Sequence, residues 1–268
     1  MVVYMTSGSK IVKITAQTAL KGNILKTIFT VCVFLFCYFI CNYSAGIFSY
    51  TGNYTFTYIL FTLMSIFIIA PLFLGLLRYI WRILFSANDN PILVFYYFSE
   101  KTKYIKALNF IFHFIFKAIP MAILIFSPTF VVWILSQKFI YELFDIATPI
   151  WTSNLNSILR ILVVFAIVSL VFYMLRFYIA PILFVADEKS DVSEILHMST
   201  VIARKSSLDF IYLISSFIGW ILISVLVIPL IFTLPYILTS YAVHVRFAIA
   251  EYNKHIGNLN NNRGVFYE

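Results

Sequence analysis

The sequence is poor in charged residues. Only 11% of its 268 residues are Asp, Glu, Lys or Arg, whereas 62% are apolar and the mean hydropathy is +0.95. A soluble domain is about 25% charged and about 45–50% apolar, so the composition excludes an ordinary soluble protein. Eight Gly and eight Pro exclude a collagen-like or Pro/Gly-rich disordered chain. The composition therefore predicts one integral membrane domain.

Cysteine is also scarce, and its placement argues against a metal centre. Cys32, Cys37 and Cys41 lie in one apolar run, where Cys37 and Cys41 share a helix face and Cys32 lies nearly opposite. Three thiols of one helix cannot surround a tetrahedral ion. We therefore expect these side chains to pack between helices, and we expect no metal and no cofactor.

The sequence lacks the common catalytic and phosphate-binding motifs. The sequence has no Gly-rich phosphate loop, no His-Glu-x-x-His and no Gly-x-Ser-x-Gly. No Asp or Glu lies inside a long apolar run, where it would carry protons or Na⁺. These absences predict that the protein is not an enzyme, and they weaken the case for an ion-coupled transporter.

Long apolar runs dominate what is present. A spanning helix needs about 20 mostly apolar residues, because the hydrocarbon layer is about 30 Å thick. Six such runs lie at 27–48, 54–77, 118–137, 158–178, 210–228 and 236–250. The predicted fold is an all-α membrane helix bundle of about six transmembrane helices in one domain, 1–252. The polar tail, 253–268, is expected to be disordered.

The third apolar region, 104–135, is too long for one span and leaves two registers open. On a helix its polar side chains share one face: Lys103, Lys106, Asn109, His113 and Lys117. This pattern predicts a basic amphipathic helix at 102–117 that lies in the membrane interface, with the span after it. In the other register the span starts near Ala107, and His113 and Lys117 lie well inside the bilayer.

A second amphipathic helix is predicted in the most polar stretch, 187–209. Asp191 can cap a helix there, with Glu194 three residues later. A stripe at helical spacing follows, formed by Val192, Ile195, Leu196, Ser199, Ile202 and Ala203.

In this predicted topology, most basic residues lie on one side of the membrane. They are Lys10, Lys13, Lys21, Lys26, Arg78, Arg82, Lys101, Lys103, Lys106, Lys189, Arg204, Lys205, Lys254 and Arg263. The other side has only Lys138 and Arg160. The positive-inside rule therefore predicts that both termini are cytoplasmic. The net charge of +8 is then an orientation signal, and we expect membrane lipids and other membrane proteins as partners, not nucleic acid.

Two segments carry a resemblance to a known family. The first is Leu20-Lys21-Gly22-Asn23. The second is an ordered set in the C-terminal half, comprising Asp187, Ser199, Phe217, Gly219, Trp220, Pro235, Tyr236 and Phe247. These residues resemble the domain of unknown function 975 family, which comprises bacterial multi-pass membrane proteins. Glu188 stands where that family usually has Pro, and the middle of the chain aligns poorly. The resemblance implies a location in the bacterial plasma membrane and implies no activity.

Ionisable groups in or near a bilayer are expensive, so each is a candidate site. The candidates for contact with lipid headgroups or a partner are Lys103, Lys106, His113, Lys117, Arg176 and Arg246. For His113 and Lys117 the preferred interpretation is that the side chain only snorkels to the interface, and for Arg176 a snorkelling or lipid-phosphate role is preferred over a transport role. His244 and Arg246 are two residues apart and must point to different faces. For both of them an ordinary helix-end role is preferred.

Two further features have competing interpretations. The first is an acidic cluster formed by Asp187, Glu188, Asp191 and Glu194. These carboxylates could bind a divalent ion, or they could be there because the helix dipole favours acidic residues at a helix N-terminus. Gly219 beside Trp220 indicates either a ligand-stacking Trp in a cleft or close helix packing at a small residue. In both cases the structural interpretation is preferred.

The sequence leaves two main functions open. The favoured one is a non-catalytic membrane scaffold or interaction protein. The alternative is a permease-like subunit, which predicts that at least two of Lys117, Arg176 and Arg246 face a common water-filled cavity. A membrane-embedded lipid enzyme, the least favoured, would need the acidic cluster to converge with His197 on a pocket.

Overall fold

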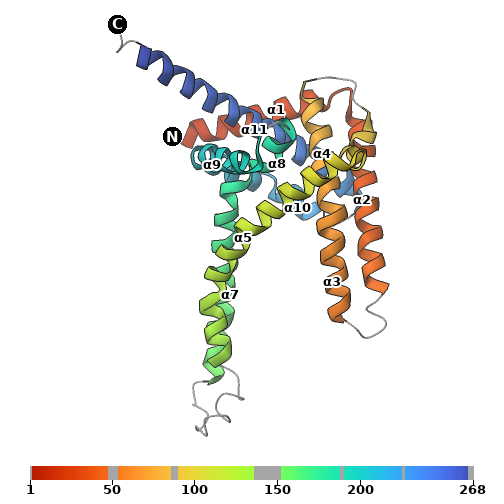
Figure 1. Ribbon diagram of the computed structural model, residues 1–268. Helices are drawn as coiled ribbons and strands as arrows, with labels where there is room; N and C mark the ends of the chain where they lie inside the picture. Colours follow the sequence, from red (N-terminus) through yellow and green to blue (C-terminus); the bar gives the residue numbers. More distant parts are fainter. Residues whose placement is uncertain are drawn as a thin grey trace. The chain divides into compact units, whose positions relative to one another are not determined.

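Long apolar helices dominate the computed structural model, which describes residues 2–47, 54–85, 90–135, 152–187, 190–224 and 227–264 (Figure 1). Every regular element in those ranges is helical, which confirms the all-α prediction. Five helices are long and apolar enough to cross a bilayer: Ile24–Ile47, Tyr54–Ile83, Lys101–Leu135, Ser157–Ala186 and Pro229–Lys254. The chain is therefore a helical membrane protein.

The chain forms two compact units, one made of Met1–Ile111 with Phe177–Glu268 and the other of Phe112–Arg176. The helices, in chain order, are α1 (Val2–Leu20), α2 (Ile24–Ile47), α3 (Tyr54–Met64), η2 (Ser65–Ile69), α4 (Ala70–Ile83), η3 (Pro91–Phe98), α5 (Lys101–Leu135), α7 (Thr152–Met174), η4 (Leu175–Phe177), α8 (Ala180–Ala186), α9 (Val192–Ser215), α10 (Ile218–Ile223) and α11 (Val227–Gly264).

The core of the first unit is built where η3 lies on α4. A Cβ atom on Gly75 of α4 would be 2.0 Å from the carbonyl oxygen of Val94, so only glycine permits this approach. Tyr97 of η3 and Phe184 of α8 are both fully buried next to this contact. Their rings lie 5.8 Å apart, and Phe184 also stacks on Phe110 at 4.4 Å. These contacts join α4, η3, α5 and α8.

α9 and α11 run antiparallel in the first unit. The rings of Phe210 and Tyr241 lie 5.8 Å apart, and those of Phe217 and Tyr236 lie 5.3 Å apart. Later residues of α9 and the segment after it therefore face earlier residues of α11. As a result, the start of α9 and the end of α11 lie at the same end of the unit.

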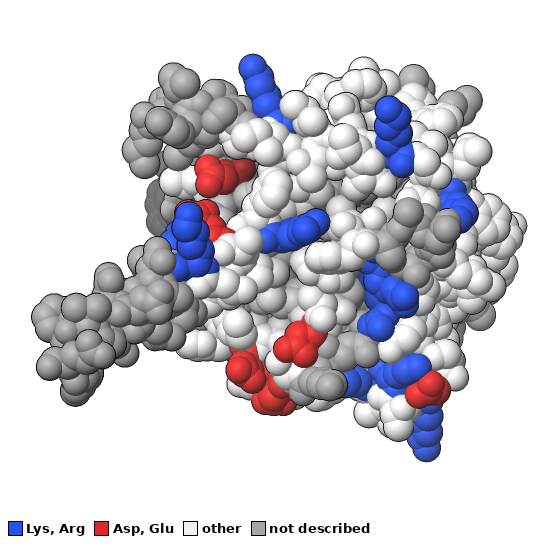
Figure 2. Space-filling model, turned by 90° about the horizontal axis from the view of Figure 1, so that it is seen from above, with Lys and Arg blue, Asp and Glu red and all other residues white. Residues whose placement is uncertain are grey.

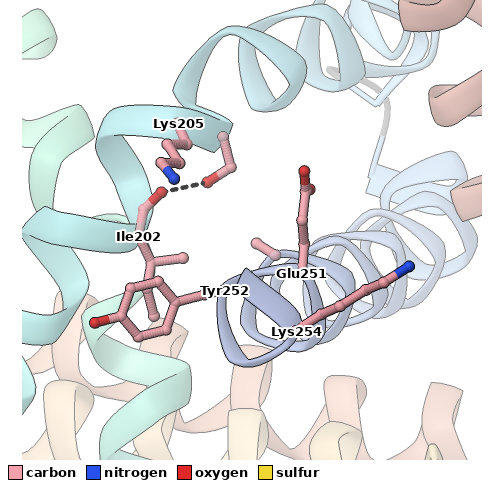
Figure 3. Close-up of a pocket in the computed structure, with 7 residues that line it drawn as sticks. Ile202, Lys205, Glu251, Tyr252 and Lys254 are labelled. Atoms are coloured by element: carbon pink, nitrogen blue, oxygen red, sulfur yellow. Dashed lines mark hydrogen bonds between the residues drawn. The ribbon is translucent and has the colours of Figure 1, made fainter. Parts of the chain in front are cut away.

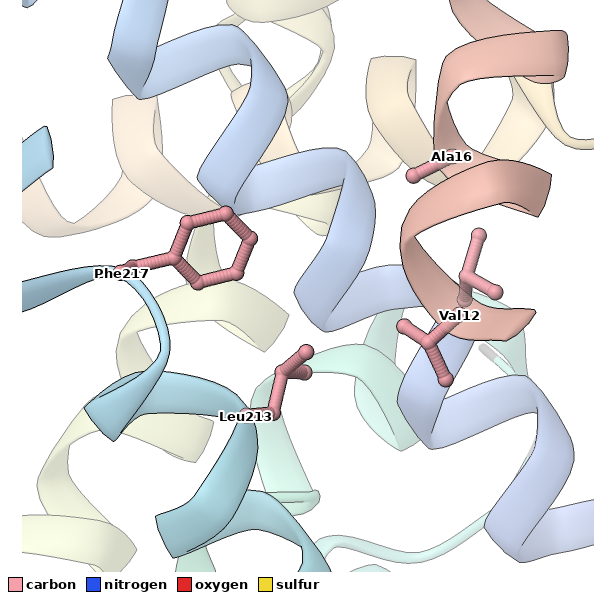
Figure 4. Close-up of a cluster of buried hydrophobic side chains, with 5 residues drawn as sticks. Val12, Ala16, Leu213 and Phe217 are labelled. Carbon is pink, nitrogen blue, oxygen red and sulfur yellow. The ribbon is translucent and has the colours of Figure 1, made fainter. Parts of the chain in front are cut away.

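α1 packs on the α9–α11 pair, which the sequence did not predict. Val12 and Ala16 of α1 form a buried cluster with Leu213, Phe217 and Val243 (Figure 4). We call this end of the first unit the polar end. It comprises α1, the last turn of α4, residues 192–209 of α9 and residues 244–254 of α11. Here a polar N-terminal segment folds as a helix because its one apolar stripe finds a partner surface.

The predicted span at 210–228 is divided in the structure. Its first residues complete α9, which ends at Ser215, and α10 contains only six residues. Six residues rise about 9 Å, far less than a bilayer. The backbone N–H of Phe217 bonds back to the Ile214 carbonyl at 2.8 Å, which closes the helix in a tight turn. The amphipathic segment after Asp191 is therefore the first part of a longer helix.

Two other elements are longer than the sequence suggests. α5 is one uninterrupted helix of 35 residues, about 52 Å long, so part of it must extend beyond a 30 Å hydrocarbon layer or tilt. It joins the predicted interfacial segment, 102–117, to the predicted span. α11 continues as helix to Gly264, where the sequence predicts a disordered tail. No Pro or Gly interrupts the polar residues after Ala250 before Gly257.

The second unit is a helical hairpin formed by residues 112–135 of α5 and by α7. The Tyr173 hydroxyl donates to the Lys117 carbonyl at 3.3 Å, which ties the two helices together. Its large apolar side chains, such as Leu124 and Phe165, are mostly exposed, as expected for helices whose solvent is lipid.

Candidate functional site

A crevice with several polar groups lies at the polar end, where α1, α9 and α11 meet. Its volume is about 520 Å³. Its polar and small lining residues are Gly8, Ser9, Ser206, Asp209, His244 and Glu251. A volume of this size is typical of a small-molecule site.

Ser206 and His244, which line this crevice, belong to a hydrogen-bonded group centred on Tyr178. The Tyr178 hydroxyl, between η4 and α8, lies 2.7 Å from Ser206 Oγ and 3.0 Å from His244 Nε2. Ser206 Oγ donates to the Ile202 carbonyl at 3.1 Å. Because each hydroxyl has one proton, Tyr178 then donates to Ser206, and a protonated Nε2 of His244 donates to Tyr178. His244 is only 6% exposed.

Ring stacking holds this group in place. Tyr178 stacks on Phe210 at 4.1 Å with the rings nearly parallel, and Phe210 lies 5.6 Å from the His244 ring. The Tyr241 hydroxyl donates to the Tyr178 carbonyl. The imidazole therefore has one fixed orientation at the edge of the crevice.

The mouth of the crevice is acidic. Asp209 of α9 and Glu251 of α11 are both exposed and line it together. A smaller neighbouring crevice of about 190 Å³ shares Ser206 and Glu251, and adds Lys205 and Lys254 (Figure 3). Figure 2 looks down from the top of Figure 1, and Lys and Arg are spread widely over the visible face while Asp and Glu gather in a few places.

α1 is fastened next to the crevice by polar contacts. The Lys13 ammonium lies 4.5 Å from the centre of the Phe217 ring and donates to the Ser216 carbonyl at 3.4 Å. Partial burial lowers the pKa of Lys13. Gln17 donates to the Tyr236 hydroxyl at 3.4 Å. Phe217 and Tyr236, predicted only as family-motif residues, are thus the surface on which α1 lies.

The other family-motif residues have structural roles of different kinds. Gly22, with φ of +92°, ends α1 in the left-handed region that favours glycine. The carbonyl of buried Asn23 accepts from both the N–H and the hydroxyl of Thr27 at 2.9 Å. The Pro235 carbonyl accepts from the Thr239 hydroxyl, and Ser199 is fully buried.

Gly219 is not a close-packing position. A Cβ atom there would meet nothing within 4 Å, and Trp220 beside it is 53% exposed. Within the part of the chain that the structure describes, no other helix therefore packs closely at Gly219. The Trp220 ring also lines none of the described crevices.

Lys103 and Arg246 lie in the first unit with aromatic partners. Lys103 pairs with Glu100 at 2.6 Å and lies 4.5 Å from the Tyr96 ring centre. Arg246 lies 4.6 Å from the Phe85 ring and donates to the Leu84 carbonyl at 3.4 Å. Lys106 is half-buried. His244 and Arg246 do point to different faces, as their spacing predicts.

The second unit contains three of the predicted residues. His113, Lys117 and Arg176 are all exposed, and the Arg176 guanidinium lies 5.9 Å from the Tyr173 ring. None of the three lines a described crevice.

The acidic cluster does not converge on a site within the described ranges. Asp187 accepts from Ser190 Oγ at 2.6 Å, and Asp191 is the N-cap residue of α9. Glu194 and His197 are exposed on α9, and Glu188 lies outside the described residues. In that part of the chain no three His, Cys, Asp or Glu side chains gather at metal-binding distances.

Comparison with known protein families, with curated proteins and with solved structures finds no match to this chain. Inferences about its function therefore depend on its own residues. The sequence did not predict that Tyr178, Ser206 and His244 form a hydrogen-bonded group. One signal was available, because Ser240 and His244 are polar residues one turn apart within the predicted span 236–250.

Proposed function

We propose that this membrane protein acts through contacts with lipids and partner proteins and has no catalytic centre of its own. The observation that carries the proposal is the exposure of Lys117, Arg176 and Arg246, none of which lines a described crevice. A permease with a polar path would instead need at least two of these cations on one cavity. Exposed cations on apolar helices suit anionic lipid headgroups.

The cellular location is part of the same proposal. The resemblance to the domain of unknown function 975 family supports the plasma membrane of a bacterial cell. The Lys and Arg residues around α1, the end of α4 and α9 support a cytoplasmic polar end. The basic residues Lys103 and Lys106 would then face the inner leaflet.

Native mass spectrometry of the detergent-solubilised full chain tests the lipid contact. We expect the protein to retain phosphatidylglycerol in preference to phosphatidylcholine. Each of Lys117→Gln, Arg176→Gln and Arg246→Gln should weaken that retention about fivefold, because each surface cation near anionic lipid contributes about 1 kcal/mol. Retention of phosphatidylcholine by the same variants is the control.

Cysteine labelling separates the proposal from the permease. In a Cys32/Cys37/Cys41→Ser background, single cysteines at positions 117, 176 and 246 are treated with a membrane-impermeant maleimide from each side. A lipid-contacting residue should react from one side at most. Reaction of any two positions from both sides, together with unchanged phosphatidylglycerol retention in the variants, would favour the permease.

A further inference from the structure

The charge of the polar-end crevice is opposite to the charge of the protein. The chain has a net charge of +8. Yet the charged side chains that line the crevice of about 520 Å³ in the described part of the chain are both carboxylates, Asp209 and Glu251. They come from different helices, α9 and α11, and face one space. A cation that enters this crevice therefore meets carboxylates from two helices.

The rest of the lining is apolar or small. Val12, Leu213, Phe247 and Ala248 provide an apolar wall, and Gly8 of α1 leaves open space, since a Cβ there would meet nothing within 4 Å. Buried His244 borders the same space with its orientation fixed by Tyr178. Two carboxylates in a crevice that also has an apolar lining suit a positive group carried on a hydrocarbon stem.

We propose that this crevice binds an alkylammonium group. The ammonium lies between Asp209 and Glu251, and its stem lies against Val12 and Leu213. Such a group occurs in the headgroup of an aminophospholipid and in soluble polyamines. The proposal goes beyond the anionic-lipid contacts proposed above, because it involves neither Lys117, Arg176 nor Arg246.

Binding to the full chain in dodecyl maltoside tests the proposal with three probes. These are phosphatidylethanolamine, its N-acetylated form, which lacks the positive charge, and spermidine. We expect an ammonium-bearing probe to bind about tenfold or more tightly than the N-acetylated lipid, measured by native mass spectrometry for lipids and calorimetry for spermidine. Binding of phosphatidylethanolamine alone assigns a lipid source, and binding of spermidine assigns a soluble source.

Variants locate the site. Asp209→Asn and Glu251→Gln should each weaken binding about tenfold. Glu194→Gln, which neutralises an exposed carboxylate of α9 outside the crevice, should leave binding unchanged. Gly8→Leu should block binding by filling the crevice from α1 while the protein stays monodisperse, because leucine favours a helix more than glycine does.

The proposal is overturned if neither ammonium probe binds better than the N-acetylated lipid. It is also overturned if Glu194→Gln weakens binding as much as Asp209→Asn does, since the effect would then be one of general surface charge. Unchanged binding by a folded Gly8→Leu protein would place the ligand elsewhere.

Discussion

Two buried tyrosines of the first unit differ in what their hydroxyls contact. Tyr178 bonds to Ser206 and His244. The Tyr97 hydroxyl, in the part of the chain that the structure describes, has no hydrogen-bond partner, although the residue is only 2% exposed. Burial raises the pKa of Tyr97, so its hydroxyl remains protonated at neutral pH. Loss of the hydroxyl should therefore have opposite effects at the two positions.

We expect Tyr178→Phe to lower the free energy of unfolding by about 1–3 kcal/mol, because Ser206 and His244 lose a buried partner. Tyr97→Phe is the matched control and should be neutral or slightly stabilising. Thermal unfolding of both purified variants in the same detergent measures the difference. Equal destabilisation by the two substitutions would show that the Tyr178 hydrogen bonds contribute nothing.

Gly75 supports a second prediction at the scale of one residue. Gly75→Ala places a methyl group against the backbone of Val94, and backbone cannot rotate away as a side chain can. We expect a loss of about 1–3 kcal/mol in unfolding free energy, despite the better helix propensity of alanine. Gly219→Ala, where a Cβ meets nothing within 4 Å, should cost little. An unchanged midpoint for Gly75→Ala would mean that η3 does not approach α4 so closely.

Charged residues of the site were easier to predict from the sequence than buried polar ones. Arg246 stood out by its charge, and its separation from His244 followed from helix geometry alone. The partners of His244 could not be predicted, because Tyr178 lies 66 residues away in sequence. A polar side chain in an apolar helix shows that a partner is needed, but not where that partner is.

At the scale of helices, the docking of α1 is the feature most open to test. Ala16 is completely buried in the cluster with Leu213, Phe217 and Val243. We expect Ala16→Arg to release α1, because a charge cannot be buried there without a partner. Hydrogen exchange should then speed up at the amides of residues 8–20, while the apolar part of α2 keeps its protection.

Thr18→Arg is the control for this prediction. Thr18 is exposed two residues further along the same helix, so its substitution adds the same charge without entering the cluster. Equal exchange rates in the Ala16→Arg variant and the wild type would contradict the packing of α1 on α9 and α11.

Hydropathy predicted the long helices because membrane spans are defined by composition and length. It did not predict α1, whose stripe of Val12 and Ala16 is too short to distinguish from a polar extension. It also placed one span at 210–228, because apolar composition continues through Ser215, Ser216 and Phe217, where the chain turns. A break made by backbone hydrogen bonds leaves little trace in an apolar sequence.

For the whole molecule, we propose that the polar end of the first unit is one cytoplasmic face. The antiparallel packing of α9 and α11 brings the end of α11 back to the level of Ser206 and Asp209. α1 contacts the same helices, so α1 and the C-terminal part of α11 lie at this end of the unit (Figure 1). By the positive-inside rule, the lysines of α1 and α9 support the proposed cytoplasmic orientation of that end.

Reporters fused to each end of this chain test the claim most directly. A fluorescent protein that matures only in the cytoplasm and a phosphatase that is active only outside are fused separately before Met1 and after Glu268, and expressed in bacteria. The account predicts bright fluorescence and an inactive phosphatase at both ends. An active phosphatase at either end would contradict it.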